Sequence, residues 1–374
     1  MNSTEAVYQE NQTTLLKKSR SLLNCFHAGN VCPPKLIVKK TLAEIPVSIL
    51  DFASIVYGDT SVASAFKRSM TLAQHAEKLG YKRYWFAEHH NMESVASAAT
   101  AVLIGHIAGG TSSIRVGSGG IMLPNHAPLV IAEQFGTLES LYPGRIDLGI
   151  GRAPGTDPFT SLALRRNLKG DINEFPNDVV ELINYLGPRL PEASVKAIPG
   201  EGTQVPVWLL GSSTYSAQLA GMLGLPFAFA SHFAPALLQE ALKVYRSHFK
   251  PSAFIEEPYT MACVNVIAAD SDSEAETLAT SFYQLALGLV RNDRRPLPAP
   301  VDSMEGIWSE AEELGVRQRM EYSFIGNAAT VSASLQSFLD KTDVDEIMVA
   351  THVFGLPAKM RSLELTASLF LTEF

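Results

Sequence analysis

From Pro46 onward, short apolar runs alternate with stretches whose apolar residues recur at helical spacing. The short runs are rich in β-branched and aromatic residues, which favour strands, and each is followed by a helical pattern. We predict eight strands, at residues 47–50, 83–87, 114–117, 145–150, 205–210, 227–231, within 260–269, and at 345–350. The predicted helices include residues 97–109, 128–141, 171–186, 273–290, 327–340 and 357–372.

Strands that alternate with helices favour parallel pairing, and eight such units match a closed (β/α)8 TIM barrel. An open doubly wound sheet would also alternate, but usually has fewer strands. Proline-rich residues 291–322 interrupt the alternation as an insertion after strand seven. From composition we therefore expect a flexible N-terminal extension over residues 1–45 and one barrel domain over residues 46–374.

Composition narrows the class of protein. Hydrophobic residues are 46% and charged residues 18% of the 374, and the formal net charge is −8, which argues against nucleic acid or an anionic membrane surface as the partner. No apolar run is long enough to span a bilayer. Only three cysteines are present: Cys25 and Cys32 could pair, whereas Cys263 is typical of a small buried residue. We expect a cytoplasmic protein without a metal site.

The second predicted strand ends in Glu88-His89-His90. In a barrel of this kind the functional site forms at the carboxyl ends of the strands, where a histidine can exchange a proton near neutral pH. Two adjacent histidines cannot both point inward from an extended chain, so at most one of His89 and His90 is expected to act. A surface or structural role for both is the alternative.

The third predicted strand runs into Gly119-Gly120. Glycines at this place allow the backbone to approach a flat ligand, although a bulge or a tight turn would need them equally. A G-x-G-x-x-G dinucleotide fingerprint is absent from this stretch.

The fourth and fifth predicted strands end in residues suited to an anion. Arg152 follows strand four and can hold a phosphate through two parallel hydrogen bonds, or pair with Asp157 instead. Ser212, Ser213 and Ser216 open the next helix, where hydroxyls and free amides attract anions, although serine is also an ordinary helix cap. Because the two strands are neighbours in a barrel, the sequence favours a joint phosphate site.

At these strand ends the chain resembles the bacterial luciferase-like flavin-dependent monooxygenase family. The resemblance covers about residues 46–374 and is specific because several motifs occur together in the right order. Within that family, the chain is most similar to an uncharacterised subgroup, through the first-strand motif Ser48-Ile49-Leu50-Asp51. The motifs are Trp85-Phe86-Ala87-Glu88-His89-His90, Val116-Gly117-Ser118-Gly119-Gly120-Ile121-Met122-Leu123-Pro124, Ala132-Glu133-Gln134-Phe135 and Tyr142-Pro143-Gly144-Arg145-Ile146-Asp147-Leu148-Gly149.

The resemblance implies a barrel that binds FMN, usually in the reduced form (FMNH2) supplied by a separate NAD(P)H-dependent flavin reductase. Dioxygen would be the co-substrate in the oxidation of a small organic substrate, with paired donors and incorporation of oxygen. By motif, His89 matches the proton-transferring histidine of the family, and Arg152 matches its phosphate-binding arginine. The remaining cofactor-binding matches are Gly119, Gly120, Ser212, Ser213 and Ser216.

Two other readings stay open at this point. A deazaflavin-dependent oxidoreductase would use the same barrel for hydride transfer, and a non-catalytic protein would bind flavin without oxygen chemistry. The resemblance also suggests that residues 291–322 form a lid over the flavin, with a disordered surface insertion as the alternative. A homodimer is possible, because family members often pair through barrel helices.

Overall fold

A computed structural model describes residues 39–153, 155–164, 174–189 and 192–370. The described residues from Lys40 onward form one compact unit. The strands are β1 (Val47–Asp51), β2 (Arg83–Phe86), β3 (Arg115–Met122), β4 (Ile146–Gly151), β5 (Val207–Gly211), β6 (Phe227–Phe229), β7 (Thr260–Ala268), β8 (Ser323–Gly326) and β9 (Glu346–Ala350). The α-helices are α2 (Ala63–Lys78), α3 (Thr100–Gly110), α4 (Pro128–Leu141), α5 (Pro158–Leu164), α6 (Phe175–Leu186), α7 (Thr214–Leu223), α8 (Leu238–His248), α9 (Asp272–Val290), α10 (Glu310–Arg319), α11 (Ala328–Thr342) and α12 (Leu356–Ser368).

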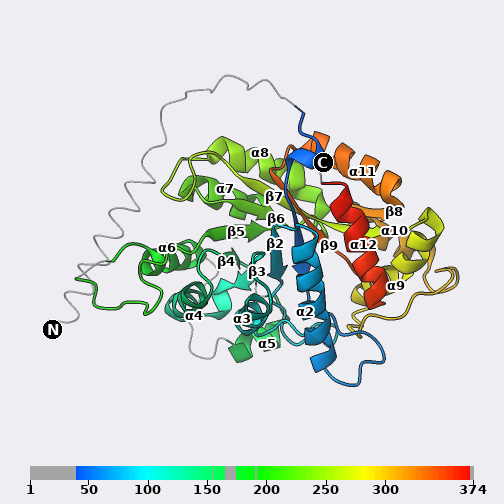
Figure 1. Cartoon of the computed structure of the whole chain (residues 1–374), viewed down its shortest axis with the longest axis horizontal. Helices are drawn as coiled ribbons and strands as arrows, with labels where there is room; N and C mark the ends of the chain where they lie inside the picture. Colours follow the sequence, from blue (N-terminus) through cyan, green and yellow to red (C-terminus); the bar gives the residue numbers. More distant parts are fainter. Residues whose placement is uncertain (1–38, 154, 165–173, 190–191, 371–374) are drawn as a thin grey trace. The chain divides into compact units, whose positions relative to one another are not determined.

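All strand pairs in the sheet are parallel, and eight of the nine strands close into a barrel (Figure 1). Strands β1 to β7 lie in chain order, and β9 fills the place between β7 and β1. This arrangement confirms the predicted (β/α)8 barrel. Each of the eight predicted strands corresponds to one barrel strand, although the individual bounds differ by a few residues.

The ninth strand, β8, was not predicted as a strand. It pairs with the second half of β7, from Asn265 to Ala268, on the edge that β6 occupies along the first half. β8 spans only four residues and is mostly half-buried, so it carries neither the length nor the continuous apolar run that identified the other strands. Helices α5, α8 and α10 were not predicted either.

The compact unit begins before the predicted domain start at residue 46. Leu42 and Ile45 are buried, and the Lys40 ammonium lies 2.8 Å from the Asp345 carboxylate. The short 3-10 helix Leu42–Glu44 therefore belongs with the barrel. The rest of the predicted extension, including Cys25 and Cys32, lies outside the described residues.

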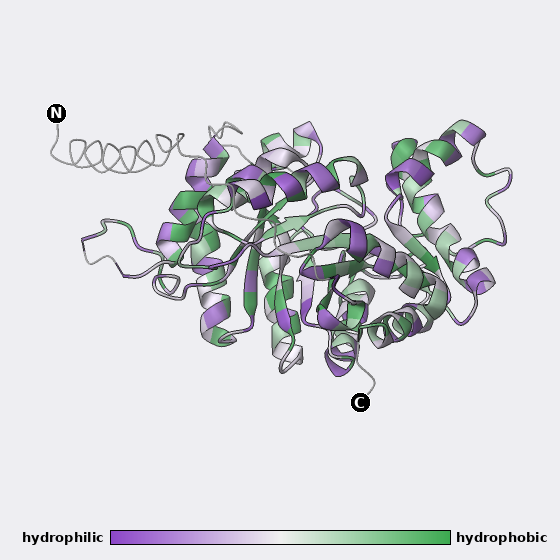
Figure 2. Ribbon diagram, turned by 90° about the horizontal axis from the view of Figure 1, so that it is seen from above, coloured by the Kyte–Doolittle hydropathy of each residue, from purple (hydrophilic) through white to green (hydrophobic). Residues whose placement is uncertain are grey.

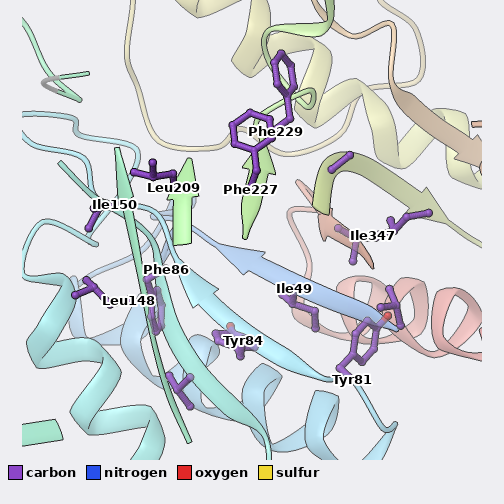
Figure 3. Close-up of a cluster of buried hydrophobic side chains, with 14 of the residues drawn as sticks. Ile49, Tyr81, Tyr84, Phe86, Leu148, Ile150, Leu209, Phe227, Phe229 and Ile347 are labelled. Atoms are coloured by element: carbon purple, nitrogen blue, oxygen red, sulfur yellow. The ribbon is translucent and has the colours of Figure 1, made fainter. Parts of the chain in front are cut away.

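Alternate residues of each barrel strand face two different environments. One set packs against the surrounding helices and forms the main core (Figure 3), for example Ile49, Tyr84 and Phe86. The other set fills the barrel interior, where Trp85 and Trp208 contact edge to face at 5.3 Å. Because both faces are buried, the strands are predominantly hydrophobic, whereas the helices carry hydrophilic residues as well (Figure 2). Cys263 belongs to the interior set and is buried, as predicted.

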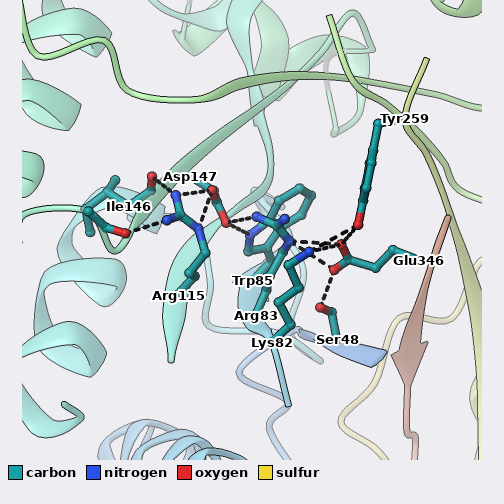
Figure 4. Close-up of polar contacts among 10 residues, drawn as sticks. Ser48, Lys82, Arg83, Trp85, Arg115, Ile146, Asp147, Tyr259 and Glu346 are labelled. Carbon is teal, nitrogen blue, oxygen red and sulfur yellow. Dashed lines mark hydrogen bonds and ion pairs between the residues drawn. The ribbon is translucent and has the colours of Figure 1, made fainter. Parts of the chain in front are cut away.

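A buried ionic network lies at the amino end of the barrel interior (Figure 4). The Arg83 guanidinium lies between two carboxylates, 2.7 Å from Asp147 and 2.9 Å from Glu346. Burial would raise the pKa of Asp147, but the charges of Arg83 and Arg115 outweigh it and hold that pKa below its ordinary value. The network joins β2 to β4 and β9, which each lie two places away from β2 in the sheet.

The insertion is ordered along its described length. It contains α10, whose Ser309 cap and Glu312 form a reciprocal capping box, and this helix packs on α9. Leu297 is buried and exchanges backbone hydrogen bonds with Ile55 and Tyr57, in the connection after β1. The insertion is therefore attached both to the connection after β1 and to α9. Its role as a lid stays a prediction.

Replacing the Arg83 side chain tests the importance of the buried network. We expect Arg83→Met to lower the free energy of unfolding by about 3–5 kcal/mol, because it leaves two buried carboxylates without their shared cation. Chemical denaturation followed by circular dichroism measures the change. The control is Arg361→Met, which removes a solvent-exposed pair with Asp270 and should have a much smaller effect. Equal losses in the two variants would contradict the prediction.

Candidate functional site

The inward and outward alternation of several strands continues for a few residues past the strand ends. The inward residues there carry ring side chains, which meet at the carboxyl end of the barrel. Phe52 follows β1 and contacts three imidazoles, with ring centroids 6.1 Å from His89, 6.1 Å from His232 and 5.1 Å from His352. Phe282 of α9 stacks on His352 at 4.5 Å. We call these five residues the ring cluster.

The structure separates the two adjacent histidines of the β2 end. His89 continues the inward series of Arg83 and Trp85 and joins the ring cluster. His90 instead donates its Nε2 hydrogen to Glu88 at 2.8 Å. Of the two, His89 is the one placed with the other ring residues, and its action in a reaction stays a prediction.

The Nδ1 atom of His89 lies 3.4 Å from the carbonyl oxygen of Gly155. Because a carbonyl only accepts, Nδ1 carries the hydrogen in this pair, and Nε2 keeps its lone pair. Burial lowers the pKa of His89, and the charges of His90 and Arg294 lower it further. The hydrogen bond to Gly155 and the charge of Glu88 raise it, but by less, so the pKa lies below its ordinary value. His89 is therefore neutral near pH 7 and able to accept a proton at Nε2.

Glu88 organises the opposite side of the β2 end. Its buried carboxylate accepts hydrogen bonds from Nε2 of His90 and from Nε2 of His126, at 2.8 and 2.9 Å. Burial raises the pKa of Glu88, but these two imidazoles lower it more, to a value below the ordinary one. The ligand atoms of the three side chains lie within 4.8 Å of one another, so the group could hold a metal ion. Direct hydrogen bonds already account for its geometry. We call this group the Glu88 cluster.

Gly119 and Gly120 lie at a shift in register between β3 and β4, and the peptide bond that joins them is cis. A Cβ atom on Gly120 would come within 2.6 Å of the Gly149 carbonyl oxygen, and one on Gly119 within 2.7 Å of the Leu50 side chain. Close packing against the backbone therefore requires glycine at position 120, whereas at position 119 the nearest atom is the end of a flexible leucine side chain. Contact with a flat ligand remains a prediction for them.

The Arg152 guanidinium follows β4 and lies over the Tyr215 ring, with its central carbon 4.1 Å from the ring centroid. Among the residues that the structure describes, no carboxylate is within ion-pair distance of it. Asp157, the alternative partner considered from the sequence, instead accepts hydrogen bonds from Asn91 and Thr160. Stacking on tyrosine fixes the guanidinium plane and leaves its N–H donors for another ligand.

The start of α7 lies beside Arg152, because Gly151 of β4 pairs with Leu210 of β5. Ser213 is the residue before the first turn, and its side chain makes no capping hydrogen bond. Ser212 is exposed, whereas Ser216 is buried beneath Gly211. An arginine and a helix start with open amides together form an arrangement that attracts a phosphate.

Four members of the ring cluster, Phe52, His232, Phe282 and His352, and one member of the Glu88 cluster were not identified from the sequence. Phe52, His232 and His352 each lie just beyond a predicted strand, but isolated residues at strand ends give no motif. His126 is far from Glu88 in the chain and reaches it only because β2 and β3 are neighbours. Extending the inward alternation two residues past each strand would have found Phe52, His232 and His352.

Comparison with known proteins shows the family of this chain. The model of one protein family, described as luciferase-like monooxygenase, matches residues 48–340. The chain belongs to the luciferase-like monooxygenase family. A "Luciferase-like monooxygenase" from Escherichia coli (strain K12) is 56% identical over 321 residues, which cover 86% of this chain and 96% of that protein. An "N-acetyl-S-alkylcysteine monooxygenase" from Bacillus subtilis (strain 168) is 37% identical over 238 residues, or 62% and 70% of the two chains.

Solved structures show the same fold. The crystal structure of apo-MsnO8 matches with a TM-score of 0.81 and 33% identity, over 87% of this chain and 98% of that one. The oxygenating component of 3,6-diketocamphane monooxygenase from Pseudomonas putida, in complex with FMN, has a TM-score of 0.66, 16% identity and coverage of 87% and 97%. An F420-dependent secondary alcohol dehydrogenase has a TM-score of 0.62 at 13% identity, with coverage of 88% and 100%.

The family assignment confirms the resemblance seen in the sequence and makes this chain an oxidoreductase of the monooxygenase type. Within the described residues, no helix has the length and apolar character that a bilayer span requires.

The Glu88 cluster predicts a pH-dependent contribution to stability. A carboxylate whose folded pKa lies below its ordinary 4.5 stabilises the protein above that pH, and the contribution is lost as the pH falls through the folded value. We expect Glu88→Gln to lower the free energy of unfolding by about 1–3 kcal/mol at neutral pH. The difference from wild type should shrink at a pH of about 3. Surface variant Glu305→Gln is the control, and a pH-independent difference for Glu88→Gln would count against this assignment.

Proposed function

We propose that the protein is an FMN-dependent monooxygenase that oxidises a small organic substrate with dioxygen and a reduced flavin. The observation that carries the proposal is the Arg152 guanidinium, which is stacked on Tyr215 at the open start of α7 and has no carboxylate partner among the described residues. A site with this donor set fits a phosphate monoester, the group that ends the ribityl chain of FMN.

In this proposal Arg152 binds the phosphate together with Ser212, Ser213, Ser216 and the first amides of α7. The flavin ring would lie against the backbone of Gly119 and Gly120, the two positions that the family resemblance implies. When bound, the reduced flavin supplies the electrons that activate dioxygen. The protein contributes binding, orientation and the exclusion of water.

His89 is the group that we propose for proton transfer. Its ring is held between Phe52 and the Gly155 carbonyl oxygen, so Nε2 has one defined direction. Because burial keeps the imidazole neutral, Nε2 can take a proton from a reacting group and return it later. The surrounding rings of Phe52, Phe282 and the other imidazoles keep this end of the barrel poor in charge.

The proposal also includes a partner and a compartment. Reduced FMN must come from an NAD(P)H-dependent flavin reductase, and we expect both proteins in the cytoplasm. For the substrate, the name of the Bacillus relative suggests N-acetyl-S-alkylcysteines as first probes.

A deazaflavin-dependent oxidoreductase is the second candidate, because a barrel of this fold serves an F420-dependent dehydrogenase. Both cofactors carry a phosphate, so Arg152 does not separate them. Visible absorption spectra of the purified protein with FMN and with F420 distinguish the two, since each cofactor changes its spectrum on binding. A non-catalytic flavin-binding protein would bind FMN but would consume no dioxygen beyond the rate of free reduced flavin.

Loss of the Arg152 charge should weaken FMN binding selectively. We expect Arg152→Gln to raise the dissociation constant for FMN by about ten- to a hundredfold, the range for one charge-assisted contact. The affinity for riboflavin, which has no phosphate, should change little. Titration calorimetry with both ligands measures the contrast, and Arg361→Gln is the matched surface control. If FMN and riboflavin lose affinity equally, Arg152 does not bind the phosphate.

The role of His89 predicts a loss of rate without a loss of cofactor. We expect His89→Gln to keep the FMN affinity and to slow turnover by about 10²–10⁴-fold, the usual contribution of a positioned acid or base. Oxygen consumption with reduced FMN and an accepted substrate measures the rate. His248→Gln, on the outer surface of α8, is the control. Unchanged turnover in His89→Gln would remove this residue from the reaction.

A further inference from the structure

Two buried polar atoms at the carboxyl end of the barrel have no hydrogen-bond partner in the described structure: Nδ1 of His232 and Oδ1 of Asn265. Polar atoms in such surroundings are nearly always paired, because burial without a partner is unfavourable. Neither residue belongs to the proposed phosphate site or to the proton-transfer step. Both therefore point to a ligand that binds in this half of the barrel.

The orientation of the Asn265 amide is fixed by its neighbours. Its Nδ2 donates to the backbone carbonyl oxygen of His232 at 2.7 Å and to the Ser323 hydroxyl at 3.0 Å. Because a carbonyl only accepts, the nitrogen must face His232, and Oδ1 points the other way as a free acceptor. Asn265 follows Met261 and Cys263 in the inward series of β7, and its side chain is 1% exposed.

Aromatic rings surround His232. Phe52 lies 6.1 Å away and Phe233 lies 5.0 Å away, measured between ring centroids. Burial lowers the pKa of His232 to about 3, with smaller effects from the charges of His352 and His89. The imidazole is therefore neutral near pH 7, and its ring nitrogens offer one donor and one acceptor. A neutral, ring-lined surrounding favours an uncharged ligand over an ion.

The position of these atoms separates them from the proposed phosphate site. Arg152 and the start of α7 follow β4 and β5, whereas His232, Asn265, His352 and Phe52 come from β6, β7, β9 and β1. In the closed barrel these two groups of strands form different halves of the ring. If FMN occupies the first half, as the proposed function holds, the second half is left for the organic substrate.

We propose that His232 and Asn265 form a substrate subsite that binds a secondary amide. The amide N–H donates to Oδ1 of Asn265, and the amide carbonyl accepts from Nδ1 of His232. The apolar part of the same molecule packs against Phe52 and Phe282. This inference rests on the proposed function, because it assigns the substrate side of the same site.

A pair of small probes tests the subsite without knowledge of the natural substrate. N-Methylbenzamide carries one amide N–H, whereas N,N-dimethylbenzamide has the same ring and carbonyl but no N–H. Dissociation constants are measured by ligand-observed NMR, with the protein loaded with FMN and also free of it. We expect wild type to bind the N-methyl probe about tenfold more tightly, the usual effect of one hydrogen bond to a buried acceptor.

Two variants locate the effect. Asn265→Leu removes the acceptor and should abolish the preference between the two probes. Since Asn265 also holds the His232 backbone and Ser323, His232→Phe provides a second test that keeps those bonds. It should weaken both probes about three- to tenfold, because both need the Nδ1 donor. His248→Phe is the matched control and should change neither constant.

The outcomes distinguish this proposal from the proposed function. Equal binding of the two probes to wild type overturns the subsite, even if FMN binds normally. Weaker FMN binding in both variants, with the probe preference intact, also overturns it and assigns the two atoms to the cofactor. Failure of FMN to bind wild type refutes the proposed function. The probe preference of the FMN-free protein tests the subsite independently of FMN binding.

Discussion

The closed barrel forces every second residue of each strand into its interior, and the rest of the structure depends on this constraint. In an extended chain successive side chains point to opposite faces, so closure leaves no choice about which set lies inside. The inward set reads from the amino to the carboxyl end as an ionic layer around Arg83, an apolar layer with Trp85 and Trp208, and the ring cluster. The chemistry of the open end is thus an extension of the same alternation.

The ionic layer and the ring cluster differ in the charge of their buried polar groups. Arg83 is surrounded by carboxylates, so its charge is neutralised within the interior. At the other end, burial keeps His89, His232 and His352 uncharged, and burial is the leading cause of the lowered pKa in each case. A paired end is suited to holding strands together, whereas an end with neutral, incompletely paired groups is suited to binding.

The fold was largely predictable from the sequence because the barrel strands are buried on both faces and therefore appear as continuous apolar runs. The same reasoning failed for β8, because this strand is short and half-buried. It also failed for α8, whose amphipathic pattern between β6 and β7 was overlooked. Arg152 and His89 were found as polar residues at strand ends. Their contacts were not predicted, because nothing in the sequence marks Tyr215 or Phe52. Tyr215 contacts Arg152, and Phe52 contacts His89, only because neighbouring strands bring each pair together.

One edge of β7 is shared by two partners in succession, with β6 along its first part and β8 along its second. Between them, the Ser231 hydroxyl donates to the Cys263 carbonyl oxygen, and Asn265 bonds the His232 carbonyl oxygen. The polypeptide between α9 and α11 is thereby fastened to a strand end that lies past the point of barrel closure. Lengthening or shortening residues 291–322 would leave the stagger of the eight barrel strands untouched, so related chains can diversify this segment without redesigning the scaffold.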